Sequence, residues 1–225
     1  MSLGPEEWQA ITLSLQVALT ATILSLPLAI WVAHVLARKT FPGKQILNAA
    51  VHLPLILPPV VTGYLLLLAF GAQGAIGAML AKIGVTLAFK WTGAVLAAAI
   101  MAFPLMVRAI RLGIEAVDPK LEQAATTLGA SPAKVFATIT LPMCLPAIIA
   151  GAVLAFAKAL GEFGATITFV ASIPGETRTL PSAIYAFLQV PGAERSAINL
   201  TIIAVIIAVA ALLISEWLAQ KAARR

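Results

Sequence analysis

Residues 121–130, Leu-Glu-Gln-Ala-Ala-Thr-Thr-Leu-Gly-Ala, lie between two strongly apolar runs but are too short and too polar to be a third. Asp118-Pro119 just before them favours a helix start, because Asp caps free N–H groups and proline lacks the N–H that would be unpaired. Gly129 can end the helix in a left-handed conformation. Ser131-Pro132 repeats the start signal at once. The sequence therefore predicts a helix, a tight turn and a second helix, a hairpin over residues 118–138.

The first helix of this hairpin has an apolar face at three- to four-residue spacing, made of Val117, Leu121, Ala124, Ala125 and Leu128. Roughly ten helical residues are about 15 Å long, too short to cross a bilayer. The apolar face needs a groove, and no soluble segment elsewhere in the chain could form one. We therefore expect a separate protein to provide it.

The composition is that of an integral membrane protein. Of 225 residues, 61% are hydrophobic and 11% are charged, with a mean hydropathy of +1.00. Soluble domains carry about 25% charged residues. With so little charge the chain could not cover a soluble surface.

Five apolar runs predict five transmembrane helices in one domain that takes in the whole chain, at 10–37, 48–70, 91–107, 139–157 and 198–218. Three prolines between Leu53 and Val60 predict an irregular or kinked entry to the second span, followed by a helix from about Val60. Small residues in the fourth span would let another helix approach closely, from the same chain or from a partner: Ala147, Gly151, Ala155 and Ala159. Residues 161–190 contain short apolar pieces, which suggest re-entrant or interfacial segments on the outer side.

The positive charges predict a periplasmic N-terminus and a cytoplasmic C-terminus. With that orientation the inner segments hold ten basic residues, namely Arg38, Lys39, Lys44, Arg108, Arg111, Lys120, Lys134, Lys221, Arg224 and Arg225. The outer segments hold five, namely Lys82, Lys90, Lys158, Arg178 and Arg195. This bias satisfies the positive-inside rule and places the hairpin in the cytoplasm.

The hairpin resembles the EAA loop of ABC-importer permeases, whose pattern is Glu-Ala-Ala, three residues, Gly, nine residues and Ile-x-Leu-Pro. Ala124, Ala125 and Gly129 match it, as does Ile139-Thr-Leu-Pro142. The family glutamate falls on Gln123, with Glu122 one residue early, so the resemblance leaves open which of the two makes the family's polar contact. It implies a coupling helix that docks in a cleft of the ATP-hydrolysing subunit through Glu122, Gln123, Ala124, Ala125, Leu128, Gly129, Ala130 and Ser131.

Longer segments resemble the molybdate permeases of bacterial ABC importers, among them 41–44, 52–60, 160–169 and 173–181. The resemblance implies an all-α integral membrane protein with an ABC type I importer permease fold, which transports molybdate or tungstate across the bacterial inner membrane. It also implies a homodimer, two cytoplasmic ABC ATPase subunits and a periplasmic oxyanion-binding protein. Sulfate permeases are similar around Gly161-Glu-Phe-Gly-Ala165, so a sulfate or thiosulfate permease remains an alternative.

Residues that could carry chemistry are scarce. No span interior contains Asp or Glu, which disfavours a proton-driven secondary anion transporter, the less favoured alternative. The chain lacks a P-loop and a clustered catalytic or metal-binding set, so we expect no enzyme and no cofactor here, with ATP and Mg²⁺ bound by the partner ATPase. The hairpin carries only Lys120 and Lys134, so nucleic-acid binding is not expected, whereas contact with membrane lipid is.

One polar cluster interrupts the apolar sequence near the outer end of the fourth span: Glu162, Thr166, Thr168 and Ser172. Glu162 could close a gate by pairing with a basic residue, or help to position a segment that lines the translocation pathway. The alternative is an interfacial acid that caps the following short helix.

Overall fold

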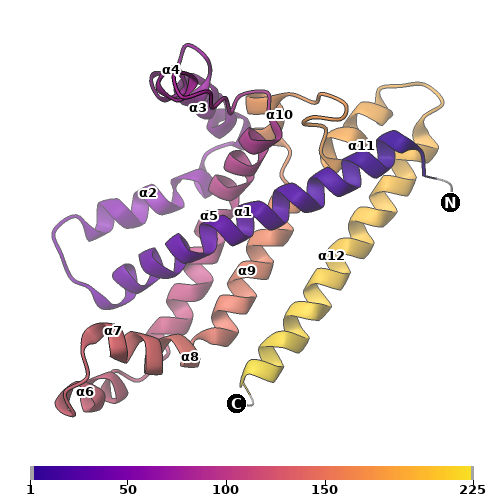
Figure 1. Cartoon of the computed structure of the whole chain (residues 1–225). Helices are drawn as coiled ribbons and strands as arrows, with labels where there is room; N and C mark the ends of the chain where they lie inside the picture. The colour runs from indigo at the N-terminus through magenta and orange to yellow at the C-terminus, as the bar shows by residue number, and fades with distance from the viewer. Residues whose placement is uncertain (1–2, 224–225) are drawn as a thin grey trace.

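The computed structural model describes residues 3–223, and all regular structure within that range is helical. Arg224 and Arg225, which were counted as inner charges, lie outside the described residues. The elements in chain order are α1 (Pro5–Arg38), α2 (Lys44–Ile56), α3 (Pro59–Phe70), α4 (Ala75–Ala81), α5 (Trp91–Glu115), α6 (Pro119–Thr127), α7 (Pro132–Val135), the π-helix η1 (Phe136–Thr140), α8 (Leu141–Met143), α9 (Leu145–Leu160), α10 (Gly164–Val170), α11 (Leu180–Leu188) and α12 (Glu194–Ala223) (Figure 1).

Three described helices are long and apolar enough to cross a membrane by themselves, namely α1, α5 and the Glu194–Leu218 part of α12. Two pairs of consecutive helices pass the same test together but are bent at a short break. The bend is 113° between α2 and α3, and 69° between Pro132–Met143 and α9. The number of spans is five if each bent pair forms one, which matches the number of apolar runs.

The break between α2 and α3 lies at Leu57 and Pro58, within the proline-rich segment. Pro54 is accommodated inside α2, and Pro59 occupies the start of α3, where its missing N–H costs nothing. The kink that the prolines predict is therefore a sharp bend between two regular helices, and the residues before it are helical from Lys44 onward.

Helix α5 forms the centre of the core and packs against both α1 and α9, which also contact each other. Many of the buried residues of these three helices are small, and they include Ala18, Ala21, Ala29, Ala33, Ala94, Ala97, Ala98, Ala102, Ala155 and Ala159. Small side chains let helix backbones come close, which is how helices associate in an apolar solvent. By contrast, α12 buries Leu200 near its start but keeps most of its large apolar side chains exposed, as suits a helix that faces lipid.

The small residues of the fourth span meet α5 of the same chain. A Cβ added to Gly113 of α5 would lie 2.2 Å from the Cβ of Ala147, and one added to Gly151 would lie 3.2 Å from Cγ1 of Ile110. A helix of the same chain therefore packs on this part of the face. The sequence alone did not decide whether that helix belongs to this chain or to a partner.

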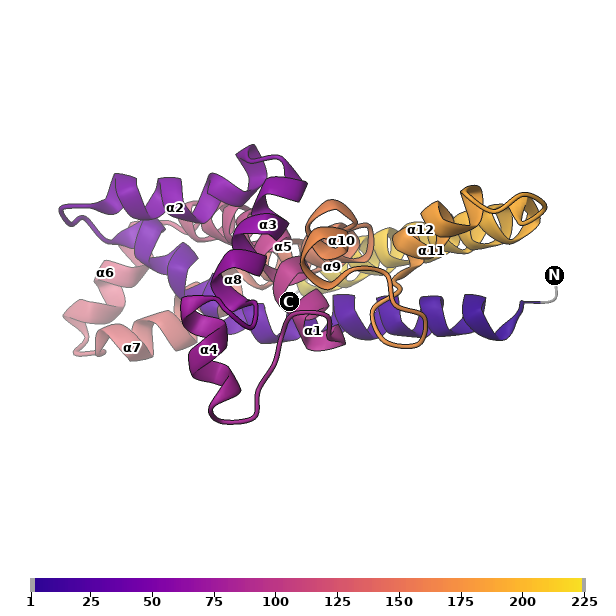
Figure 2. The same cartoon turned by 90° about the horizontal axis from the view of Figure 1, so that it is seen from above.

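The hairpin and the short helices α4, α10 and α11 lie at opposite ends of the molecule (Figure 1). Helices α6 and α7 are at the same end as the C-terminus of α12, whereas α4, α10 and α11 are at the other end (Figure 1). Helix α1 connects the two ends, since it runs from beside α11 to the hairpin side of the molecule (Figures 1 and 2).

The tight contact between Gly113 and Ala147 predicts an unusual result for Gly113→Ala. In a helix this change normally stabilises by about 1 kcal/mol. Here the added methyl group overpacks the α5–α9 contact, and we expect a net loss on the order of 1–3 kcal/mol, measured as a lower Tm of the detergent-purified protein. Adding Ala147→Gly removes the opposing methyl group and should restore most of the loss. A Gly113→Ala variant that is as stable as wild type would contradict this packing.

Candidate functional site

The hairpin is built from the caps and the glycine that its sequence predicts. The Asp118 carboxylate accepts a hydrogen bond from the Lys120 N–H at 2.9 Å and so caps α6. Gly129 has φ +86°, in the left-handed region, and the N–H of Ala130 reaches back to the carbonyl of Ala125 at 3.0 Å. Ser131 accepts from the Lys134 N–H and caps α7. The backbone thus forms two short helices joined by a glycine turn.

The hairpin presents apolar groups to its surroundings. Leu128 is 89% exposed and Leu121 is 44% exposed, whereas Val117 is buried against the rest of the chain. Most of the predicted docking residues are also exposed, namely Gln123, Ala124, Gly129 and Ser131, with Ala125 and Ala130 partly exposed. Leu128 thus leaves most of its apolar surface in water, and burial of that surface in another protein would be favourable.

Glu122 differs from the other predicted docking residues, because its carboxylate points back toward the spans. The Arg38 Nε lies 3.1 Å from Oε2 and 3.3 Å from Oε1, and the Thr140 hydroxyl donates to Oε1 at 2.6 Å. Arg38 also donates from Nη2 to the carbonyl of Val117 at 2.8 Å. Gln123 makes none of these contacts and is exposed. The two candidates for the polar contact therefore have different surroundings.

A small pocket of about 180 Å³ lies at the foot of the hairpin, between the end of α1 and η1. Its lining includes His34, Arg38, Glu122 and Thr140. The imidazole ring of His34 also meets the ring of Phe136 edge to face, with 4.7 Å between ring centroids. The end of α1 thus contacts both parts of the hairpin region through polar and aromatic groups.

The outer polar cluster is centred on Glu162, which is almost completely buried. Its Oε2 pairs with Lys158 Nζ at 2.8 Å, and its Oε1 accepts from the N–H of Ala165 at 2.9 Å. Glu162 therefore has both contacts that the sequence suggested as alternatives, a basic partner and the cap of a short helix.

The other three members of the outer cluster lie on α10 or just after it. The hydroxyl of Thr166 donates to the carbonyl of Phe163 at 2.9 Å, and that of Thr168 donates to the carbonyl of Gly164 at 2.8 Å. The Ser172 hydroxyl is buried and has no hydrogen-bond partner among the described residues. Thr166 and Thr168 are thus satisfied within their own helix, while Ser172 is not.

The segment after α10 is strained. Ala171 has φ +60° and ψ −162°, a conformation that is essentially confined to glycine and costs on the order of 1–3 kcal/mol. Thr177 holds this segment in place: its hydroxyl donates to the carbonyl of Val170 at 3.1 Å and accepts from the N–H of Ile173 at 2.9 Å. Strain of this kind gathers at segments that move or bind.

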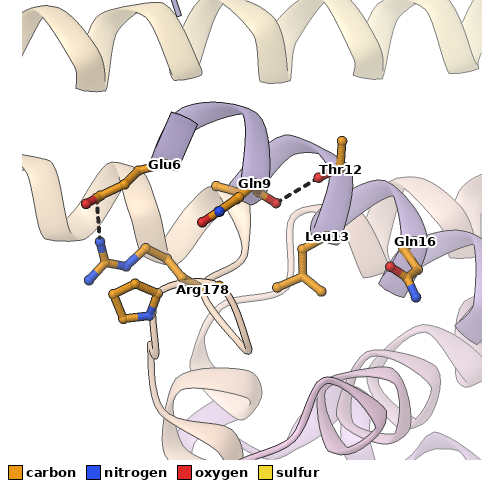
Figure 3. A pocket seen from close by; sticks show the side chains of 9 residues that line it. Glu6, Gln9, Thr12, Leu13, Gln16 and Arg178 are labelled. Atoms are coloured by element: carbon orange, nitrogen blue, oxygen red, sulfur yellow. Dashed lines mark hydrogen bonds and ion pairs between the residues drawn. The ribbon is translucent and has the colours of Figure 1, made fainter. Parts of the chain in front are cut away.

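Sequence reasoning missed the contacts that join α1 to this outer segment. Glu6 and Arg178 form an ion pair of 3.1 Å beside a pocket of about 160 Å³, which Gln9, Gln16 and neighbouring residues line (Figure 3). The Ser14 hydroxyl also accepts from the N–H of Leu180, at 2.5 Å. These partners lie more than 160 residues apart, so no local pattern could have indicated them.

Comparison with known proteins places this arrangement in a family. The family described as "Binding-protein-dependent transport system inner membrane component" matches residues 25–225. The chain belongs to this family. It is therefore a multi-pass protein of the inner membrane and a transport subunit, and ATP hydrolysis resides in separate subunits of such importers.

Two curated relatives match nearly the whole chain. The "Molybdenum transport system permease protein ModB" of Escherichia coli (strain K12) is 61% identical over 221 residues, which cover 98% of this chain and 96% of the relative. The protein of the same name from Haemophilus influenzae is 57% identical over 216 residues, 96% of this chain and 94% of the relative.

The fold also matches a solved structure, described as a bacterial ABC transporter involved in the import of the acidic polysaccharide alginate. The TM-score is 0.77 at 19% identity, over 97% of this chain and 80% of that one. At this identity the likeness establishes the fold alone, and it confirms the expectation of an ABC importer permease fold.

Proposed function

We propose that this chain is the membrane-spanning subunit of an ATP-driven importer that moves molybdate, or tungstate, across the inner membrane. The observation that carries the proposal is the 61% identity to a molybdenum permease over 98% of the chain.

The working assembly in this proposal is a homodimer with two cytoplasmic ABC ATPase subunits and a periplasmic oxyanion-binding protein, embedded in lipid. Each chain has one hairpin, so two copies would engage the two ATPase subunits in the same way. ATP and Mg²⁺ would be bound by the ATPase subunits, with no cofactor in this chain. Selection of the anion would rest with the binding protein.

The hairpin would be the docking element. Exposed Leu128 and the adjoining glycine turn would enter a cleft of the ATPase, where burying a leucine side chain contributes about 1.5–3 kcal/mol. This proposal places the hairpin and the C-terminus in the cytoplasm and the N-terminus in the periplasm, in keeping with the distribution of basic residues.

Transport would follow alternating access. ATP binding closes the ATPase pair, the docked hairpins move together, and the two permease subunits open outward. Glu162, Thr166, Thr168 and Ser172 would line or gate the pathway at its outer end. The ion pair between Glu162 and Lys158 supports a gate that is kept closed by a local charge pair.

Two other functions compete with this proposal. A sulfate or thiosulfate permease would have the same assembly but a different anion preference. A secondary anion transporter would work without an ATPase, and the lack of acidic residues within the span interiors weighs against it.

Reconstitution decides among the three. The chain is co-purified with its candidate ATPase and binding protein, and ATP-dependent uptake into liposomes is measured with molybdate, tungstate, sulfate and thiosulfate. We expect ATP-dependent uptake of molybdate that excess sulfate does not suppress. Preferential sulfate uptake would favour the first alternative, and uptake without any ATPase subunit would favour the second.

The left-handed turn of the hairpin predicts a docking defect in Gly129→Val. A β-branched residue resists positive φ, and forcing it there costs about 1–2 kcal/mol or a five- to thirty-fold loss of affinity. We expect less ATPase subunit to be retained when the complex is purified. The matched control is Gly129→Asn, because Asn tolerates this conformation. Equal retention by both variants would show that the turn does not control docking.

The charge pair in the outer cluster predicts a transport defect in Glu162→Gln. Glutamine can still accept from the N–H of Ala165, but it cannot balance the charge of Lys158. We expect the initial uptake rate to fall by about five-fold or more, with the yield of assembled complex unchanged. Glu176→Gln, which removes the more exposed outer pair with Lys90, is the control. Normal uptake in Glu162→Gln would leave Glu162 with the role of a helix cap alone.

A further inference from the structure

The foot of the hairpin is fastened to the end of α1 by one carboxylate. The Glu122 carboxylate forms an ion pair with Arg38 in the last turn of α1 and accepts a hydrogen bond from the hydroxyl of Thr140 at the end of η1. The side chains of Arg38 and Glu122 are only 17% and 19% exposed, and Thr140 is fully buried. Three elements that are separate in sequence thus meet at this carboxylate.

These contacts are stronger than those of an ordinary surface ion pair. Partial burial shields this pair from water and salt. The 2.6 Å bond from the Thr140 hydroxyl to the carboxylate has the short length of a charge-assisted hydrogen bond, a class about twice as strong as neutral ones. Arg38 also bonds the carbonyl of Val117, directly before the cap of α6. One guanidinium group therefore holds both the carboxylate on α6 and the backbone that leads into it.

The geometry leaves Glu122 poorly placed to serve a partner. Both carboxylate oxygens face Arg38 or Thr140 and the side chain is only 19% exposed, so little of the carboxylate is open to a partner. A partner that displaced Arg38 would leave its guanidinium group without its counter-charge. Breaking a largely buried pair from one side is strongly destabilising. Gln123, one residue further along, is exposed and free of such contacts.

The π-helical turn contributes to the same arrangement. Residues Phe136–Thr140 form η1, and single turns of this wider kind are frequent at functional sites. The turn ends at Thr140, whose hydroxyl reaches Glu122, while Phe136 at its start contacts His34 of α1. The second half of the hairpin region is thereby joined to α1 as well.

We infer that Glu122 is a positioning residue that locks the hairpin to α1 through Arg38 and Thr140, so that movement of the docked hairpin is passed directly to α1. The polar contact with the ATPase then falls to Gln123. This inference rests on the proposed function, because it requires an ATPase that moves the hairpin.

The test compares Glu122→Gln, Arg38→Gln and the double variant in the complete complex in liposomes. Three quantities are measured: ATPase subunit retained on purification, ATP hydrolysed per anion imported, and hydrogen exchange of residues 34–39 with and without nucleotide. The control is Glu115→Gln, which removes an Arg–Glu pair that lies within α5 alone, with a distance of 2.7 Å to Arg111.

We expect every variant to retain its ATPase subunit. In Glu122→Gln the ATP hydrolysed per anion should rise by about five-fold or more, as expected for the loss of a typical coupling energy. Nucleotide should change the exchange of residues 34–39 in wild type and in Glu115→Gln, but not in Glu122→Gln. The effect of the double variant should be smaller than the sum of the two single effects, because both single changes remove the same Arg38–Glu122 interaction.

Thr140→Val removes a single hydrogen bond to Glu122, so it should change the ATP hydrolysed per anion and the hydrogen exchange in the same direction but by less. This milder variant keeps the inference testable if the charge variants fold poorly. Loss of the ATPase subunit from Glu122→Gln would make Glu122 a docking residue and overturn the inference, as would wild-type coupling or additive effects in the double variant. Hydrogen exchange needs no substrate. If the complex failed to import molybdate, the proposed function would be wrong. The hydrogen-exchange comparison would still test whether Glu122 joins the hairpin to α1.

Discussion

Close packing of α1, α5 and α9 is the constraint on which the rest of this structure depends. In a bilayer the tails of lipids are as apolar as leucine, so helices associate through backbone proximity and van der Waals contact. Alanine and glycine line these contacts, and at Gly113 and Ala147 there is no room for one further methyl group. The small size of these side chains therefore sets how closely the spans pack. The polar ends of the molecule are attached to this packed core.

The polar ends are organised in a different way. Each is joined to α1 by a small number of charged or hydroxyl contacts, Arg38 with Glu122 at one end and Glu6 with Arg178 at the other. Such contacts depend on direction and distance, and the residues that make them lie outside the packed apolar core. A transport subunit needs this division, because its core must stay intact while its ends respond to partners.

The sequence was sufficient for those features that arise from neighbouring residues. Asp118, Ser131 and Gly129 predict the caps and the turn of the hairpin, and the structure has all three. The apolar runs predict the spanning helices, and the prolines predict the break after α2. The hydrophobic pattern could not give the 113° angle of that break, because such an angle is set by packing between α3 and α10. Nor could it separate Glu122 from Gln123, since the partner of Glu122 lies 84 residues away.

The length of α1 gives these contacts a shared mechanical meaning. The helix is unbroken over 34 residues, even at Pro27, and is therefore about 50 Å long. Pro27 removes one backbone hydrogen bond, but the helix continues through it, so we treat α1 as tilting in one piece. A tilt of about 5° around its midpoint would carry each end sideways by about 2 Å, in opposite directions. A displacement of the hairpin end would thus produce an opposite displacement beside the strained segment around Ala171.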